Sequence, residues 1–161
     1  KVMSGLMPYV DVVIANEEDA EKVFGIKAGE SNITQGKLSE AGYREVAQQL
    51  VERFGFKKVA ITLRESLSAS INNWSGLLYN TEEFFRSRIY TIHIVDRVGG
   101  GDSFAAGLIY GLISGMSDKD ALEFAAAASC LKHTILGDFN LVSASEVQTL
   151  AAGDQSGRVQ R

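Results

Sequence analysis

Three glycines in succession, at residues 99–101, constrain the fold of this 161-residue chain more than any other feature. Before them, residues 88–96 (RIYTIHIVD) alternate between apolar and polar side chains, which predicts a strand that ends near Asp96. After them, residues 103–114 show helical spacing of apolar side chains, so we expect a helix that begins within a residue or two of Gly101. The apolar side chains at that spacing are Phe104, Leu108 and Leu112. A helix N-terminus offers unpartnered N–H groups, and glycine lets an anion approach them, so the stretch predicts an anion site.

The rest of the chain alternates between expected strands and helices. Strands are expected at residues 10–15 and 57–63, and as a hairpin of residues 68–74 and 76–80 with its turn near residues 73–76. Helices are expected at residues 17–25 and 39–54, and after Ser117 and Ser143, which form capping boxes with Asp120 and Glu146. A polar loop is expected at residues 27–36. This order predicts an α/β layer fold whose sheet is at least partly parallel.

Composition excludes several classes of protein. The hydrophobic content of 45% suits one compact domain, and the net charge of -4 gives no basic patch for nucleic acid. No apolar run reaches the ~20 residues that would span a bilayer, so we expect no membrane partner. The single cysteine, Cys130, excludes an internal disulfide, and we expect an inert core thiol in a cytoplasmic protein. The chain begins without methionine, and its first residues are expected to lie partway through a helix, so we expect an N-terminal portion to be missing.

The aspartate that follows the glycines points to chemistry. A dinucleotide-binding motif that starts at Gly99 would need glycine at position 104, which is Phe104, and a P-loop would need lysine where Asp102 stands. A carboxylate would repel a phosphate that only had to be held. It is useful if it accepts a proton from an attacking hydroxyl while the backbone amides stabilise the transferring phosphoryl group. The alternative is that Asp102 only complements the helix dipole and the glycines only form a turn.

These residues resemble a known family. The stretch DRVGGGDSFAAG is similar to the D-T-x-G-A-G-D-x-F-x-A-G motif of the PfkB, or ribokinase-like, carbohydrate kinases. The resemblance implies a three-layer α/β sheet with helices on both faces, of which residues 1–152 would form the C-terminal, nucleotide-binding portion and residues 153–161 a frayed tail. It implies ATP and Mg²⁺, with Asp102 as the general base, next to the sugar, and the amides of Gly99, Gly100, Gly101 and Asp102 as the anion hole.

Arg97 replaces the threonine of the family motif, and Gly100 replaces its alanine. The arginine resembles that of bacterial 2-keto-3-deoxygluconate kinases, so we expect it to bind the carboxylate of a sugar acid, although a solvent-exposed Arg97 is equally compatible with the sequence. The same resemblance places a monovalent cation such as K⁺ near Asp96. Most sugar contacts and a lid that could form a homo-oligomer would belong to the missing N-terminal portion, so this piece need not turn over substrate by itself.

Weaker similarities concern the nucleotide and the metal. The stretch ANEED is similar to the N-x-x-E element, so Asn16 and Asp19 are expected to organise Mg²⁺ and phosphate; an N-cap pair is the alternative. The stretch ITLRES lies where the family has a nucleotide turn, which implies contacts from Thr62, Arg64 and Ser66, although both glycines of that turn are absent. The stretch FAAAASCLKHTILGD is similar to the adenine-side helix. It implies adenine contacts from Ala126, Ser129 and His133, with close helix packing as the other role of its alanines.

Two other functions stay open at this point. A serine hydrolase would use Ser103 as nucleophile, with His93 or His133 as base, although Ala105 stands where a G-x-S-x-G elbow has its last glycine. A non-catalytic nucleotide-binding module would share the glycine loop but give Asp102 no task.

Overall fold

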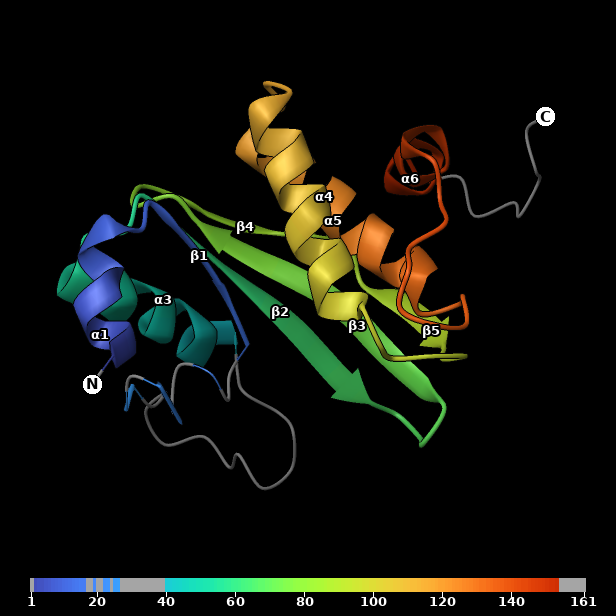
Figure 1. Ribbon diagram of the computed structural model, residues 1–161, viewed down its shortest axis with the longest axis horizontal. Coiled ribbons are helices and arrows are strands. Elements are labelled where there is room, and N and C mark those ends of the chain that lie inside the picture. Colours follow the sequence, from blue (N-terminus) through green and yellow to red (C-terminus); the bar gives the residue numbers. More distant parts are fainter. Residues whose placement is uncertain (1, 17–18, 20–21, 24, 27–39, 154–161) are drawn as a thin grey trace.

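The protein is described by a computed structural model that covers residues 2–16, 19, 22–23, 25–26 and 40–153. Five strands form one mixed sheet (Figure 1). The strands are β1 (Val12–Ala15), β2 (Lys58–Ser66), β3 (Ile71–Tyr79), β4 (Phe84–Arg86) and β5 (Tyr90–His93). β1 pairs with β2 in parallel, and all other pairs are antiparallel, with β4 and β5 sharing one edge of β3. The expectation of a partly parallel sheet is therefore confirmed.

Helices cover both faces of this sheet, which confirms the three-layer arrangement (Figure 1). The helix α3 (Glu40–Phe54) lies on one face, where Val59, Ile61 and Leu77 are buried against it. The helices α4 (Gly100–Ile113) and α5 (Asp118–Lys132) lie on the other face, which carries Ala60 and Leu78. The alternation along β2 and β3 thus fills two separate cores. Other helices are α1 (Val2–Leu6), the 3₁₀ turn η1 (Met7–Tyr9) and α6 (Ala144–Ala151), which packs on α5.

Small residues let α4 and α5 pack closely. A Cβ added to Gly107 would lie 2.9 Å from the Cα of Ala125, and one added to Gly111 would lie 2.8 Å from the Cα of Ala121. Phe104 and Leu108 of α4 are completely buried in the same interface layer. The alanines Ala121 and Ala125 of α5 therefore serve close packing against the middle and the C-terminal part of α4.

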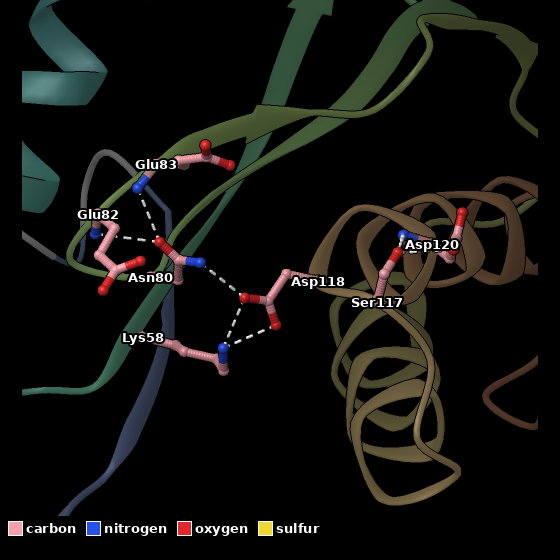
Figure 2. A network of polar contacts seen from close by, with 7 residues as sticks. All are labelled: Lys58, Asn80, Glu82, Glu83, Ser117, Asp118 and Asp120. Carbon is pink, nitrogen blue, oxygen red and sulfur yellow. Dashed lines mark hydrogen bonds and ion pairs between the residues drawn. The ribbon is translucent and has the colours of Figure 1, made fainter.

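A polar network fixes α5 to the sheet at the far end of β2 (Figure 2). The carboxylate of Asp118 accepts two hydrogen bonds of 2.7 Å from Lys58 Nζ and one of 2.9 Å from the amide of Asn80. Lys58 begins β2, whereas the glycine turn lies near the opposite end, beside the β2–β3 hairpin. This network is therefore structural and separate from the glycine turn.

The expected hairpin turn near residues 73–76 is wrong. β3 runs unbroken through that segment, and the turn lies at residues 67–70, where the backbone amides of Leu67 and Ser68 donate to the carbonyl of Ile71. The turn-forming residue Asn73 instead makes cross-strand contacts, since its amide donates to Glu65 and accepts from Thr91. Gly76 is needed inside the strand, because a Cβ there would lie 2.8 Å from the ring of Phe104.

The helix boundaries agree well with the sequence. α4 begins at Gly100 as expected, and β5 ends at His93, three residues before Asp96. The capping box of Ser143 and Glu146 is confirmed, whereas Ser117 accepts from the backbone of Asp120 without the reciprocal backbone bond. The loop at residues 27–36 lies outside the described residues, as do most of residues 17–25 and the tail from residue 154. In the part of the chain that is described, no helix is long and apolar enough to cross a bilayer.

Candidate functional site

The loop between β5 and α4 is held by the turn that follows α5. The backbone amides of Val95 and Asp96 both donate to the carbonyl of His133, at 2.9 and 3.2 Å. The carboxylate of Asp96 accepts from the amide of Val98 at 3.0 Å and from the amide of Gly137 at 2.8 Å. These two backbone hydrogen bonds hold the pKa of Asp96 below its usual value. Asp96 therefore shapes the loop and joins it to the turn at residues 133–138.

The first two glycines are required by close packing. Gly99 is the N-cap of α4 with a φ of 77°, and a Cβ there would lie 2.3 Å from the carbonyl oxygen of Asp138. A Cβ on Gly100 would lie 2.6 Å from the imidazole of His133. Gly101 differs, because nothing lies within 4 Å of its added Cβ. The third glycine thus leaves open space at the start of the helix, where a ligand can approach the backbone.

The first turn of α4 has free N–H groups. The amide of Gly100 donates to Arg97 O at 3.3 Å, and that of Ser103 donates to Gly99 O at 2.9 Å. Within the described residues, no backbone or side-chain acceptor takes the amides of Gly101 and Asp102, and no side chain caps the helix. Because these amides stand at the positive end of a 14-residue helix, they are available to an anion, and the anion site stays a prediction.

The carboxylate of Asp102 stands in the same turn and faces solvent. The residue is exposed, and no hydrogen bond or ion pair joins its side chain to another described residue. A free carboxylate next to free amides can accept a proton while the amides bind an anion. The exposed position of Asp102 is compatible with the general-base hypothesis and equally with a residue that only complements the helix dipole.

Ser129 and His133 support the glycines from inside the protein. The hydroxyl of Ser129 is buried and donates to Gly100 O at 2.7 Å. His133 Nδ1 lies 2.7 Å from Ser129 O, and the ring packs on Trp74 at a centroid distance of 4.8 Å. Burial lowers the pKa of His133, so the imidazole is neutral near pH 7. Ala126 is completely buried, so in this structure the side chains expected to contact adenine face the core.

Two arginines lie beside the glycine turn. Arg97 Nη2 donates to Ala69 O at 2.9 Å. When the side-chain amide of Asn72 is oriented so that its nitrogen donates to Ile71 O, its oxygen accepts from Arg97 Nη1 at 3.1 Å. Arg97 is exposed but tied to the β2–β3 hairpin. The positive charges of Arg97 and Arg64 both act on His133 and, after burial, help to lower its pKa. The turn therefore has both cationic side chains and the carboxylates of Asp96 and Asp102 near it.

Thr62, Arg64 and Ser66 alternate along β2, on the sheet face that also carries α4. Asn16 follows β1 directly, one step beyond the register pair of Ala15 with Ile61, so it lies at the level of Thr62. The predicted nucleotide strand and the ANEED element thus lie at one end of the parallel pair.

Asn16 and Asp19 form a reciprocal helix cap. Asn16 N donates to Asp19 Oδ2 at 3.0 Å, and Asp19 N donates to Asn16 Oδ1 at 2.9 Å. The N-cap alternative is therefore realised. No three His, Cys, Asp or Glu side chains of the described residues gather closely enough to hold a metal ion by themselves. Mg²⁺ often keeps only one or two protein ligands next to substrate phosphates, so this arrangement is compatible with a metal held chiefly by a nucleotide.

The serine-hydrolase geometry is absent from the described residues. The hydroxyl of Ser103 is buried and accepts a hydrogen bond of 2.6 Å from the amide of Asn140, and neither His93 nor His133 bonds to it. Burial raises the pKa of the Cys130 thiol to about 11, as expected for an inert thiol.

Sequence reasoning missed Asn140, Gly137, Asp138 and Lys132, all of which contact the glycine turn or its first helix residues. The dipeptide formed by Gly137 and Asp138 was the one local signal of a turn there.

Comparisons with known proteins indicate the family of this chain. The model of the pfkB family carbohydrate kinase matches residues 1–140. A solved structure of 2-dehydro-3-deoxygluconokinase from Thermotoga maritima is 50% identical with a TM-score of 0.87, covering 94% of this chain and 44% of its own. A structure of a putative 2-keto-3-deoxygluconate kinase from Enterococcus faecalis is 28% identical with a TM-score of 0.80, over 96% of this chain and 44% of its own. The 2-dehydro-3-deoxygalactonokinase of Haloferax volcanii is 27% identical over 94% of this chain and 41% of its own length. The chain thus spans less than half the length of these relatives.

Proposed function

Because the chain belongs to the PfkB family of carbohydrate kinases, we propose that the protein transfers a phosphoryl group from ATP to a hydroxyl of a sugar acid, 2-keto-3-deoxygluconate. The observation that carries the proposal is the pairing of free amides at Gly101 and Asp102 with the exposed Asp102 carboxylate. The names of the relatives from Thermotoga maritima and Enterococcus faecalis support the choice of sugar acid.

In this proposal Asp102 is the general base. Its carboxylate takes the proton of the attacking hydroxyl as the new O–P bond forms and the bond to the leaving ADP oxygen breaks. The amides of Gly99, Gly100, Gly101 and Asp102 are the proposed anion hole; that of Gly100 already donates to Arg97 O, whereas those of Gly101 and Asp102 are free to bind the transferring group. Donors fixed by the fold need no rearrangement when charge develops on the phosphoryl oxygens.

The nucleotide would lie along the β2 side of the turn. The proposed contacts to ribose and phosphate are Thr62, Arg64 and Ser66. The adenine would lie over the surface of the protein beneath which Ala126, Ser129 and His133 are buried. Mg²⁺ neutralises phosphate charge when bound, and Asn16 and Asp19 are the proposed residues on its protein side. From the described residues, their side chains each accept one backbone N–H, which leaves lone pairs for a metal or its water.

Arg97 is the proposed partner of the substrate carboxylate. A guanidinium has five N–H donors, of which two are used toward Ala69 and Asn72. The hairpin contacts fix the side chain, and the remaining donors can bind a carboxylate in a bidentate manner.

The test is a panel of sugars and sugar acids with MgATP, assayed on the full-length protein by coupled detection of ADP. We expect turnover with 2-keto-3-deoxygluconate and much lower kcat/KM with neutral sugars such as fructose or ribose. The Arg97→Gln variant should lose preference for the acid while keeping its affinity for ATP. Nucleotide binding without turnover on any member of the panel would instead favour the non-catalytic module.

A further inference from the structure

Lys132, the last residue of α5, is completely buried. Lysine is rarely fully buried in proteins unless it is paired, so some group of the protein must compensate the buried charge. Its ammonium Nζ donates a hydrogen bond of 3.1 Å to the carbonyl of Ile135. No carboxylate oxygen of the described residues lies within ion-pair distance of it. The charge is therefore met by a backbone carbonyl rather than by a direct salt bridge.

The lysine stem lies directly against the glycine turn. A Cβ added to Gly99 would meet the carbonyl oxygen of Asp138 at 2.3 Å, the Asp138 carboxylate at 3.0 Å and the Cε of Lys132 at 3.2 Å. Gly99 is thus enclosed between the post-α5 turn and the end of the lysine side chain. The ammonium therefore lies between the turn at residues 135–138 and the loop at residues 96–99.

Asp96 connects these same two segments and lies within electrostatic reach of the lysine. Its carboxylate bonds to Val98 and Gly137, and the Lys132 charge adds to these hydrogen bonds in stabilising the anionic form. Carbonyl oxygens and a nearby carboxylate are the ligands of a monovalent cation. Here the Lys132 ammonium has the Ile135 carbonyl as its ligand and the Asp96 carboxylate within electrostatic reach.

We propose that the Lys132 ammonium is a built-in cation that holds the turn at residues 135–138 against the glycine loop, so that the anion site forms without a bound potassium ion. Lys132 is then a positioning residue: it fixes Gly99 and, through it, the free amides of Gly101 and Asp102. This inference rests on the proposed kinase function, and it replaces the expected K⁺ near Asp96 with a side chain of the protein itself.

The experiment compares the full-length wild-type protein with Lys132→Ala, Lys132→Met and the control Lys119→Met, which changes an exposed lysine of the same helix. Affinity for MgADP is measured by calorimetry, and kcat is measured with 2-keto-3-deoxygluconate. Each is determined in potassium, ammonium and tetramethylammonium chloride at equal ionic strength. Tetramethylammonium keeps the ionic strength but is too large to replace a small cation.

We expect the wild type and Lys119→Met to be indifferent to the cation. Lys132→Ala in tetramethylammonium should lose MgADP affinity about tenfold, which is ~1.4 kcal/mol. Potassium or ammonium should restore it in a saturable manner, because the truncated side chain leaves room for the ion. Lys132→Met should lose the same affinity without rescue, because its side chain fills that space.

Two results would overturn the inference. One is a wild-type protein that itself needs potassium or ammonium, which decides the matter even if both lysine variants fail to fold. The other is a Lys132→Ala variant that matches the wild type in tetramethylammonium or that no cation rescues. If the wild type binds no nucleotide, the proposed function fails separately. Amide exchange at residues 95–101 then tests Lys132, and it should be faster in Lys132→Ala and slowed again by potassium.

Discussion

The hydroxyl of Ser129 donates a 2.7 Å hydrogen bond to the carbonyl oxygen of Gly100, and both residues are buried. The bond joins the last turns of α5 to the first turn of α4, where the free amides stand. It is one of several contacts by which residues 129–138 hold the glycine turn from behind. The proposed anion site therefore depends on two segments, since the two bonded residues are 29 positions apart in the sequence.

Ser129→Ala should destabilise the protein without abolishing activity. The substitution removes one buried donor, and the Gly100 carbonyl keeps its place as a helix acceptor, so the expected loss in free energy of unfolding is about 1 kcal/mol. Urea unfolding of the full-length protein measures it. Ser114→Ala, an exposed serine at the end of α4, is the control and should change the free energy little. A loss of activity with no loss of stability would contradict the supporting role of Ser129.

Alanine at two neighbouring glycines should have opposite effects on stability. Gly100→Ala places a Cβ 2.6 Å from the His133 imidazole, and overpacking of this kind typically costs about 1–3 kcal/mol. Gly101→Ala meets nothing within 4 Å and should be neutral or stabilising by up to about 1 kcal/mol, because alanine favours helix.

Nucleotide affinity separates the roles of these two glycines. If phosphate approaches the amide of Gly101, the added methyl group stands in its path, and we expect MgADP affinity to fall about tenfold, or ~1.4 kcal/mol, in a fully folded protein. Thermal unfolding and calorimetry on the same samples measure both quantities. A stable Gly101→Ala variant with unchanged affinity would place the phosphates elsewhere.

The sequence was enough for the strand–glycine–helix unit, because its information is local. β-branched alternation ends near the loop, and the apolar spacing of α4 begins just after it, so Gly100 as the first helical residue could be foreseen. The hairpin turn could not, because the choice depended on tertiary contacts. Asn73 is a good turn former, but it bonds across the sheet to Glu65, and the place of Gly76 is set by the ring of Phe104.

The outer parts of the site were harder to predict for the same reason. Periodicity places Ser129 on a helix but does not say that its hydroxyl faces Gly100 rather than a nucleotide. A lysine in the last turn of a helix is usually exposed to solvent, and only the fold shows that Lys132 is buried beneath Gly99. Spacing within one element is visible in a sequence, whereas contacts between α4 and the turn after α5 are not.

His133 should make stability depend on pH in the mildly acidic range. Burial holds its pKa below the usual value in the folded state, so the unfolded chain binds the proton more readily. Stability from this group is therefore fully present well above the unfolded pKa of about 6.5 and is lost as the pH falls below it. His133→Gln should weaken this dependence between about pH 5 and pH 7 in urea unfolding, with the exposed His93→Gln as control. An identical slope in His133→Gln and wild type would assign the dependence to other groups.

Asp102→Asn should nearly abolish turnover in the full-length protein while leaving the KM for ATP almost unchanged. An amide cannot take the proton of the attacking hydroxyl, and the backbone amides proposed to bind phosphate remain in place. General-base catalysis typically contributes ~10²–10⁴-fold, so we expect kcat to fall by roughly that factor. Steady-state kinetics with saturating sugar acid and MgATP measure it. Asp96→Asn should have a smaller effect on kcat, because that carboxylate shapes the loop through Val98 and Gly137 rather than meeting the proton.

The matched control is Ser103→Ala, one residue further along α4. Its hydroxyl is buried against Asn140, so the variant should lose about 1 kcal/mol of stability but keep most of its turnover. A serine nucleophile would require the reverse pattern, with Ser103→Ala inactive and Asp102→Asn active. If Asp102→Asn kept a near-normal kcat, the carboxylate would be only a helix-terminus residue, and the proton would have to leave by another group near the turn. Because Asp102 is an exposed carboxylate without a bonding partner among the described residues, we expect Asp102→Asn to be inactive and Ser103→Ala to be active.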